Sequence, residues 1–265
     1  MADNVFRGLD GTQLGVNFWQ DANTNFYRTL SSDINHWFNP SSNQVFKRAS
    51  TTMDLGGWQS LTRQDAHSDF NDYLVTNAII QDTYIRFDGT TNTHGSATSA
   101  IADTRTDGTG RGDVILMKCD VTNLVLPPRE AELQMACTPT NGPVVFYVYR
   151  LTSDWDENAT ASQAKPDVAL TWSAGTFSAA DYDPQPVGVG IAGSGSGLNT
   201  FVDITALVQQ WVSGASPNHG VVLIVQPVWD QPVIDPTFTN WKQFSLTTRE
   251  SIPTNQRPIL ACLRR

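Results

Sequence analysis

Apolar residues recur along this chain in short runs of strand length, separated by residues that form turns. Seven such runs lie in the C-terminal two thirds: Thr83–Phe87, Val114–Cys119, Ala131–Ala136, Val144–Leu151, Gly220–Gln226, Gln243–Thr247 and Pro258–Leu263. Clusters of Pro, Gly, Asn and Asp lie between them, which is typical of a β-sandwich. The run that begins at Val144 is apolar on both faces and predicts a strand in the middle of a sheet.

Helical periodicity is scarce and is clearest in the segment Asp203–Trp211. Its apolar residues fall at i, i+3, i+4 and i+7, which is one face of a short helix: Ile204, Leu207, Val208 and Trp211. Asp203 or Thr205 can cap the N-terminus of this helix, and Gly214 can end it. The pattern therefore predicts an all-β sandwich with one short helix, which we expect to plug one end of the sandwich.

The first 80 residues differ from the rest because Asn and aromatic residues interleave there and regular alternation is weak. We interpret residues 1–80 as an extended arm, or as an elaborated N-terminal attachment region with short strands and loops. Residues 81–265 form the predicted sandwich. Within it, the Gly- and Ser-rich stretch Gly188–Gly197 is expected to be a long surface loop.

The composition excludes several function classes. Only 16% of the 265 residues are charged, against roughly 25% in a typical globular chain, and the net charge is −9. This balance argues against nucleic acid as a partner and against a polybasic membrane anchor. No run approaches the roughly 18 apolar residues of a membrane span, so we expect no membrane insertion.

The N-terminus and the cysteines point to the cellular compartment in which the chain folds. The N-terminus has no basic segment followed by an apolar run, so we expect no secretory signal. Cys119, Cys137 and Cys262 are odd in number and widely spaced, which favours small reduced core residues over a disulfide framework or a zinc site. Both features favour folding in a reducing cytoplasm.

Several fragments occur in a characteristic order. They are Asp82–Ile85 with Asn92 and Gly95, Val114–Val121, Tyr149–Glu157 followed by Leu170–Trp172, Phe201–Gly214 followed by Asn218–Leu223, Phe244–Glu250, and Arg257–Leu260. In this order the chain resembles the DNRLRE domain family over about residues 81–265. That family is also described as a disaggregatase-related or carbohydrate-binding jelly-roll module. Cys119 departs from its pattern, because the family has a phenylalanine after the lysine.

The resemblance implies a jelly-roll β-sandwich, on secreted or cell-surface proteins, that binds polysaccharide or mediates adhesion and is not itself an enzyme. The residues that carry the structural motif are Trp155, Glu157, Trp172, Asp203, Trp211, Asn218, Gly220 and Arg249. Their chemistry also suits a structural role. The three tryptophans are spaced to enter a core, the Asn218-His-Gly turn leads into a buried strand, and Arg249 can pair with Glu250.

Catalytic and metal-binding patterns are weak. The four histidines are scattered, and no nucleophile elbow or phosphate-binding loop is present. The carboxylates Asp154, Asp156 and Glu157 cluster, so a glycoside-acting enzyme is a third alternative. We expect no organic cofactor. Calcium is a candidate ligand, because loop carboxylates of jelly-roll modules can hold it, and the candidates are Asp82, Asp88, Asp103 and Asp107.

Two sets of aromatic residues are candidates for contacts with other molecules. Sugars stack on exposed rings, which makes Trp229, Tyr182 and Trp241 the glycan-binding candidates, with burial in a core or an interface as the alternative reading. Aromatics concentrate at the centres of interfaces. The N-terminal set is therefore a candidate subunit interface, with a local mini-core as its alternative: Phe18, Trp19, Trp37 and Phe38.

An adhesive module without a signal peptide fits a protein that folds in a host cytoplasm and works outside it after lysis. The first hypothesis is thus a non-catalytic protein on the surface of a bacteriophage particle, most simply a capsid decoration protein. Its expected partners are the major capsid protein or a tail protein, further copies of itself, and host surface polysaccharide. The alternative is a free polysaccharide-binding module that works outside cells.

Overall fold

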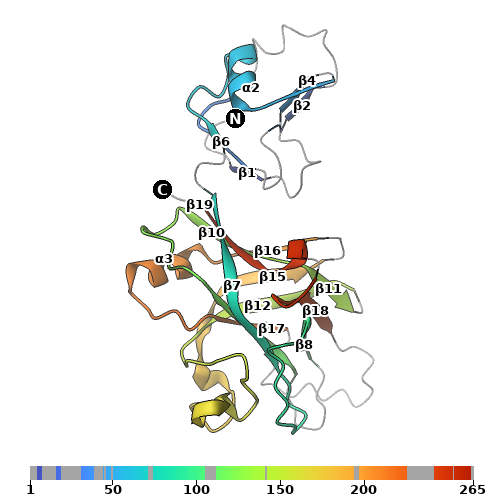
Figure 1. Cartoon of the computed structure of the whole chain (residues 1–265), viewed down its shortest axis with the longest axis vertical. Coiled ribbons are helices and arrows are strands. Elements are labelled where there is room, and N and C mark those ends of the chain that lie inside the picture. The colour runs from blue at the N-terminus through green and yellow to red at the C-terminus, as the bar shows by residue number, and fades with distance from the viewer. Residues whose placement is uncertain are drawn as a thin grey trace. The chain divides into compact units, whose positions relative to one another are not determined.

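The computed structural model divides the chain into two compact units, Met1–Leu74 (unit 1) and Val75–Arg265 (unit 2), both drawn in Figure 1. The residues that the structure describes are 5–7, 16–18, 31–38, 44, 46–48, 50–70, 74–104, 112–140, 142–193, 197–225, 242–252 and 254–263. Among them, no helix has the length and hydrophobicity that crossing a membrane requires.

Unit 1 is built from very short strands and one helix. Its strands are β1 (Val5–Arg7), β2 (Val16–Phe18), β3 (His36–Phe38), β4 (Phe46–Arg48), β5 (Thr51–Met53) and β6 (Asp69–Phe70). They form two three-stranded sheets in the orders β1-β3-β6 and β2-β4-β5. The first sheet is parallel, whereas β4 pairs in parallel with β2 and antiparallel with β5. This unit corresponds to the elaborated N-terminal region of the sequence interpretation.

The helix of unit 1, α2 (Leu55–Thr62), was not anticipated from the sequence. The Asp54 side chain caps it by accepting a hydrogen bond from the backbone of Gly57 at 2.8 Å. One face of α2 buries Trp58, whose ring stacks on Phe46 with 5.3 Å between centroids, and Trp37 meets Phe46 edge-on at 4.9 Å. These three aromatic residues form a small core of their own.

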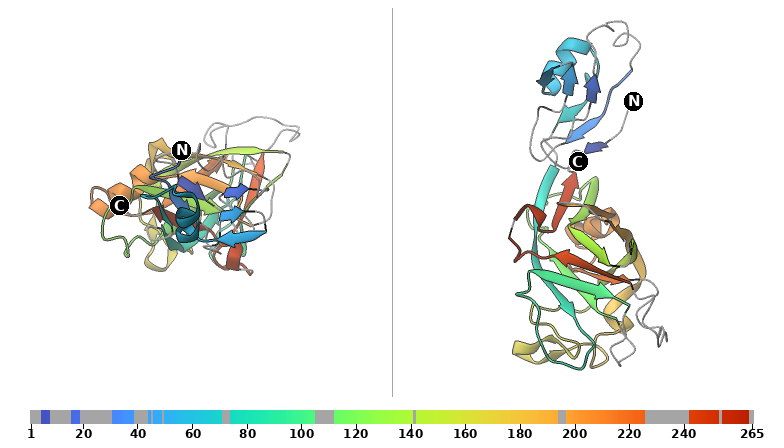
Figure 2. Two further views of the ribbon diagram at one scale, coloured as in Figure 1. Left: turned by 90° about the horizontal axis from the view of Figure 1, so that it is seen from above. Right: turned by 90° about the vertical axis from the view of Figure 1, so that its right-hand side faces the viewer.

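Unit 2 is an all-β sandwich of jelly-roll type, as the sequence predicts. Its large sheet has the order β15-β12-β17-β9-β7-β19-β10-β16, and a second layer has the order β11-β18-β8. The strands of the large sheet are β7 (Leu74–Ile85), β9 (Val114–Cys119), β10 (Glu130–Met135), β12 (Val144–Leu151), β15 (Tyr182–Ala192), β16 (Thr200–Asp203), β17 (Val221–Val225) and β19 (Ile259–Leu263). Those of the second layer are β8 (Ser99–Asp103), β11 (Cys137–Thr140) and β18 (Gln243–Thr247). Figure 2 shows both layers from a second direction.

The main core lies between these two layers. Phe146 of β12 meets Phe244 of β18 with 4.8 Å between ring centroids, which ties the large sheet to the second layer. Burial raises the pKa of the Cys119 and Cys137 thiols to about 12, so these cysteines are inert core residues. Ile79 also belongs to this core, and the sandwich therefore includes residues ahead of position 81, where the sequence interpretation placed its start.

The predicted helix is α3 (Thr205–Ser213), and it packs on the main core. Leu207, Val208 and Trp211 are its buried residues, and Gly214 ends it in the left-handed conformation at φ 74°. The expected cap at Asp203 or Thr205 is wrong, because the N-cap is Ile204 and no side chain caps the helix. Asp203 instead accepts a hydrogen bond from the backbone of Thr205 at 2.8 Å, just ahead of the helix.

A second core covers the outer face of the large sheet. The chain leaves β12 at Leu151 and returns in β15 at Tyr182, and we call the residues between them, 152–181, the excursion. The excursion carries two short strands and two 3-10 turns: β13 (Gln163–Lys165), β14 (Leu170–Thr171), η1 (Pro166–Val168) and η2 (Ala179–Asp181). Its Trp155, Trp172 and Phe177 pack against outward-facing residues of β9 and β17. Both faces of these strands are therefore buried, which explains why their sequences are continuously apolar.

The expected loop at Gly188–Gly197 is wrong over its first half, because β15 extends to Ala192. The glycines of this strand are needed for close packing. A Cβ atom on Gly190 would lie 2.2 Å from the Phe146 ring, and one on Gly188 would lie 2.6 Å from Val202. The glycines that suggested a loop are therefore residues of a strand, where their lack of a side chain leaves room for residues of neighbouring strands.

Candidate functional site

Three polar clusters stand out in the described residues, and the first joins three segments of unit 2. It consists of Asp82 on β7, Glu157 in the excursion, and Arg249 and Glu250 in the turn after β18, and we call it the Arg249 junction. Arg249 donates through Nε and Nη2 to the two oxygens of Glu157, both at 2.6 Å. Its Nε also lies 2.8 Å from Glu250, and its backbone N–H donates to Asp82 at 2.8 Å. The expected pairing of Arg249 with Glu250 is thus observed.

The Arg249 junction holds three carboxyl groups and one guanidinium, so negative charge is in excess. Asp82 is only 1% exposed. Burial and the nearby Glu250 carboxyl, opposed by the Arg249 backbone N–H, together raise its pKa to about 7. One oxygen of Asp82 and one of Glu250 are buried without a hydrogen-bond partner. A proton on Asp82 would give this carboxyl pair the donor it lacks.

The second cluster gathers positive charge around Asp154, which follows β12. Lys165 of β13 donates to one oxygen of Asp154. Lys118 of β9 and the His219 ring each lie 3.6 Å from the other oxygen. Burial raises the pKa of Asp154, but the Lys165 hydrogen bond and the charges of Lys118 and His219 outweigh burial and hold it below its ordinary value. We call these four residues the Asp154 cluster.

The backbone around the Asp154 cluster is held by residues of the sequence motif. The indole of Trp155 donates to the carbonyl of His219 at 2.7 Å, and Asn218 donates to the carbonyl of Cys119 at 2.9 Å. Gly220 has a φ of 86°, and a Cβ atom there would lie 2.2 Å from the Met117 carbonyl oxygen. Only glycine fits this turn. The motif residues Trp155, Asn218 and Gly220 therefore hold the backbone around the Asp154 cluster and carry no charge themselves.

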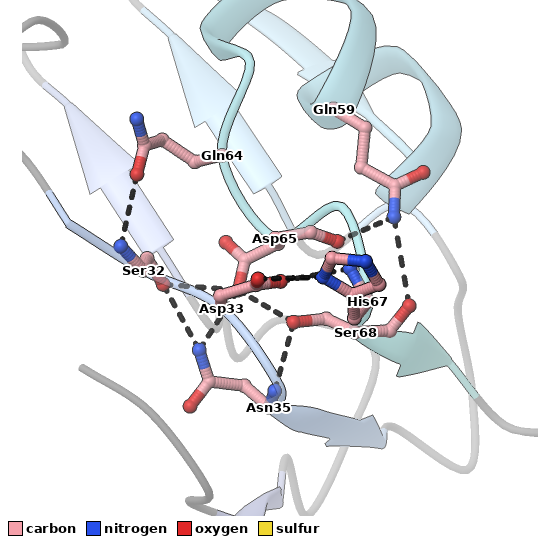
Figure 3. Close-up of polar contacts among 8 residues, drawn as sticks. All are labelled: Ser32, Asp33, Asn35, Gln59, Gln64, Asp65, His67 and Ser68. Atoms are coloured by element: carbon pink, nitrogen blue, oxygen red, sulfur yellow. Dashed lines mark hydrogen bonds and ion pairs between the residues drawn. The ribbon is translucent and has the colours of Figure 1, made fainter.

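The third cluster lies in unit 1 and surrounds the buried carboxylate of Asp65 (Figure 3). Ser32, Asn35 and Ser68 donate to its Oδ1 at distances of 2.8–2.9 Å, and the Trp58 indole donates to its Oδ2 at 2.9 Å. All four donors are uncharged. They tie α2 to the segment before β3, and we call this set the Asp65 network.

Beside the Asp65 network lies an exposed pair, Asp33 and His67, also drawn in Figure 3. The His67 ring lies 2.7 Å from Asp33, and this hydrogen bond raises the pKa of His67 and lowers that of Asp33. Ile34, which directly follows Asp33, has a φ of 54°, which a β-branched residue rarely adopts. The side-chain contacts of its neighbours hold Ile34 in this strained conformation.

The tryptophans of the motif are all buried. Trp155 and Trp172 are each 1% exposed and lie in the second core, where the Trp172 indole donates to the carbonyl of Thr160 at 2.7 Å. Trp211 lies in the main core. None of these rings is available to stack on a sugar.

The glycan-binding candidates have different positions. Tyr182 is 6% exposed, with its ring packed against Tyr149 and Phe177, so it presents no open face. The other two candidates, Trp229 and Trp241, lie outside the described residues. Aromatic stacking on a sugar therefore stays a prediction for those two residues.

The N-terminal aromatic candidates divide in the same way. Trp37 is 2% exposed and belongs to the aromatic core of unit 1, which agrees with the mini-core alternative for this residue. Phe18 and Phe38 lie on β2 and β3, but their side chains are outside the described residues, as is all of Trp19.

The described calcium candidates have separate structural roles. Asp82 belongs to the Arg249 junction, Asp88 accepts hydrogen bonds from Thr90 within its own turn, and Asp103 accepts one from the backbone of Asp113 at 3.0 Å. Asp107 lies outside the described residues. Across the part of the chain that the structure describes, no group of three or more His, Cys, Asp or Glu residues could hold a metal ion.

The acidic run 154–157 also divides among separate contacts. Asp154 faces the cations of its cluster, Glu157 is bound by Arg249, and Asp156 accepts a hydrogen bond from the backbone of Asn158 at 2.9 Å. The backbone at Gly95 packs closely against that of Glu157 in the Arg249 junction, because a Cβ atom on Gly95 would lie 2.4 Å from the Glu157 carbonyl oxygen. These carboxylates hold loops in place.

The chain was also compared with known proteins. No family model and no curated protein matches it.

Proposed function

We propose that this chain is a non-catalytic structural and adhesive protein on the surface of a bacteriophage particle, most simply a capsid decoration protein. It would fold in the host cytoplasm and reach the outside on lysis. Residues 1–80 would attach it to the major capsid protein or a tail protein, next to further copies of itself. The sandwich would face the solvent and contact host polysaccharide.

One observation carries this proposal: the charged clusters described in unit 2 fasten its loops to the sandwich. Arg249 joins β7, the excursion and the turn after β18 through contacts of 2.6–2.8 Å. The acidic run 154–157 is divided among three separate contacts, so its carboxylates do not face each other as an acid–base pair. A rigid sandwich with fastened loops supports a structural role better than a catalytic one.

A capsid-binding experiment with the 265-residue chain tests the proposal. We expect it to bind capsids from the same gene cluster saturably and at a fixed copy number. Ile34→Glu in unit 1 and Ile252→Glu in unit 2 form a matched pair, because the side chains are 49% and 87% exposed. Attachment through unit 1 predicts that Ile34→Glu weakens capsid binding more than Ile252→Glu does. Binding that does not saturate contradicts the proposal.

A free polysaccharide-binding module is the second candidate, and the Asp154 cluster favours it. Two lysines and a histidine surround one carboxylate there, in a chain of net charge −9. In affinity gels, this candidate predicts retardation by polysaccharide together with the absence of any capsid binding. Release of reducing sugar that is lost in Glu157→Gln would contradict both non-catalytic candidates.

A further inference from the structure

We propose that Lys118, Lys165 and His219, gathered around Asp154, form a binding site for a tetrahedral oxyanion, a phosphate or sulfate group carried on a polysaccharide. The nature of the carrier rests on the adhesive role proposed above. Binding of the anion itself rests on the geometry and charge of the Asp154 cluster.

The first argument is the local charge. The chain has four lysines, Lys47, Lys118, Lys165 and Lys242, and two of them converge on this one carboxylate. The two lysine ammonium groups and the one Asp154 carboxylate leave a net charge of +1. This positive site lies on a chain of net charge −9, so it is a local exception to the negative charge of the molecule.

The second argument is unused hydrogen-bonding capacity. The Lys118 ammonium and the His219 ring lie 3.6 Å from Asp154, which is too long for a hydrogen bond. Their side chains are 21% and 23% exposed, so solvent and ligands can reach them. Both groups can therefore donate to an oxyanion while Lys165 keeps its hydrogen bond to Asp154.

The third argument is preorganisation. Lys118 lies on β9 in the middle of the large sheet, and the turn that carries His219 is fixed by Trp155 and Asn218. The excursion segment is fixed as well, because the backbone of Asp156 donates to the carbonyl of Ala164 at 3.1 Å. A ligand would order little of this backbone on binding, which lowers the entropic cost.

The donor chemistry indicates the ligand class. An arginine fork matches carboxylate and phosphate alike through two parallel hydrogen bonds, whereas an ammonium group acts as a point charge. The chain contains 13 arginines, yet the Asp154 cluster contains lysine and histidine. Three separate donor groups match the three terminal oxygens of a phosphate or sulfate ester better than the two oxygens of a uronic acid carboxylate.

Affinity gel electrophoresis of the 265-residue chain tests the site. Gels contain dextran sulfate, phosphorylated dextran, polygalacturonate or neutral dextran, and Lys118→Gln is compared with Lys242→Gln. The two variants lose the same charge, but Lys242 lies beside Thr104 in the second layer. We expect retardation by both tetrahedral polyanions, a loss of about 10-fold in affinity for Lys118→Gln, and wild-type affinity for Lys242→Gln.

A second readout separates a binding defect from a folding defect. The indole N–H resonance of Trp155 reports on the site, because this group donates to the His219 carbonyl. We expect inorganic phosphate or sulfate to shift that resonance saturably in the wild type and in Lys242→Gln, and not in a folded Lys118→Gln.

Three results would overturn the site: an unshifted Trp155 resonance, equal losses in the two lysine variants, or equally strong retardation by polygalacturonate. Capsid binding is measured separately. If the protein binds oxyanions but no capsids, the role on a phage particle is contradicted and the oxyanion site is retained. If it binds capsids but no oxyanions, only the oxyanion site is contradicted.

Discussion

Unit 1 buries Asp65 and unit 2 buries Asp82, and the two carboxyl groups differ in how fully they are hydrogen-bonded. Asp65 accepts hydrogen bonds from four uncharged donors on both of its oxygens. Asp82 accepts a hydrogen bond from the backbone of Arg249, whose guanidinium binds Glu157 and Glu250, and one Asp82 oxygen has no partner. A buried carboxylate whose oxygens are all hydrogen-bonded stabilises the folded unit. When one oxygen lacks a partner, ionising the buried carboxyl group lowers the free energy of unfolding. Replacing each aspartate by asparagine should therefore have opposite effects.

The largest expected effect is that of Asp65→Asn. The amide would place an N–H group against donors that the carboxylate accepts, leaving at least one of them buried and unpaired. We expect the free energy of unfolding of unit 1 to fall by about 3 kcal/mol, measured by urea denaturation with tryptophan fluorescence. Asp33→Asn, at an exposed pair, is the control and should leave the midpoint nearly unchanged. Equal midpoints for Asp65→Asn and the wild type would contradict the account of the Asp65 network.

The next effect is the pH dependence of unit 2. The pKa of Asp82 is about 7 in the folded state and ordinarily 3.8, so between these values the folded state holds a proton that the unfolded state has lost. The free energy of unfolding should therefore fall by about 2–4 kcal/mol from pH 5 to pH 8, and then level off. The carboxyl groups with lowered pKa, such as Asp154 and Asp88, act below this window. Burial lowers the pKa of His94 from 6.5, so His94 offsets part of the fall below about pH 6.5, and the fall is steepest above that pH. Denaturation midpoints across the series measure the trend, and a rise with pH would contradict it.

Asp82→Asn sharpens the comparison. Its amide can donate to Glu250 at every pH, so the trend between pH 5 and pH 8 should disappear. At pH 8 we expect this variant to be about 1–2 kcal/mol more stable than the wild type, because a buried ionised group has been removed. Asp88→Asn, in a surface turn, should keep the wild-type trend. A variant that is less stable than the wild type at pH 8 would show that the Asp82 charge stabilises the junction.

The smallest effect concerns the strain at Ile34. Asn tolerates the left-handed region better than a β-branched residue, so Ile34→Asn should stabilise unit 1 by about 1 kcal/mol. The same fluorescence-detected denaturation measures this gain. A loss of stability would mean that the Ile34 side chain contributes contacts that outweigh the strain.

Three strands have the bounds that the sequence predicts: Val114–Cys119, Val144–Leu151 and Gln243–Thr247. The first two are continuous or nearly continuous apolar runs, and the third alternates between buried and partly exposed residues, so each pattern can be recognised without knowledge of the neighbouring strands. Strand β15 was missed because two prolines and two glycines lie within it, and the glycines are explained only by the Phe146 ring and Val202. Helix α2 was missed because Gly56 and Gly57 weaken its pattern, although the cap at Asp54 was a usable signal.

The polar clusters were less predictable than the strands, because most of their contacts join residues that are far apart in the sequence. Arg249 and Glu250 are adjacent, so their pairing could be expected from the sequence. Glu157 reaches Arg249 from 92 positions away, and Asn35 reaches Asp65 from 30. Contacts at such separations depend on the whole fold, and a single sequence carries no periodicity that reveals them.

The excursion between β12 and β15 has a consequence for how this chain changes over evolution. Loops between strands usually tolerate deletion, exchange and circular permutation. Removing residues 152–181 would uncover apolar side chains on the outer face of the sheet, among them Leu116, Val222 and Ile224. Variants that shorten it should thus be lost to aggregation, and insertions should be tolerated at its exposed turns. We therefore expect variants that keep this sheet to keep the length of the excursion as well.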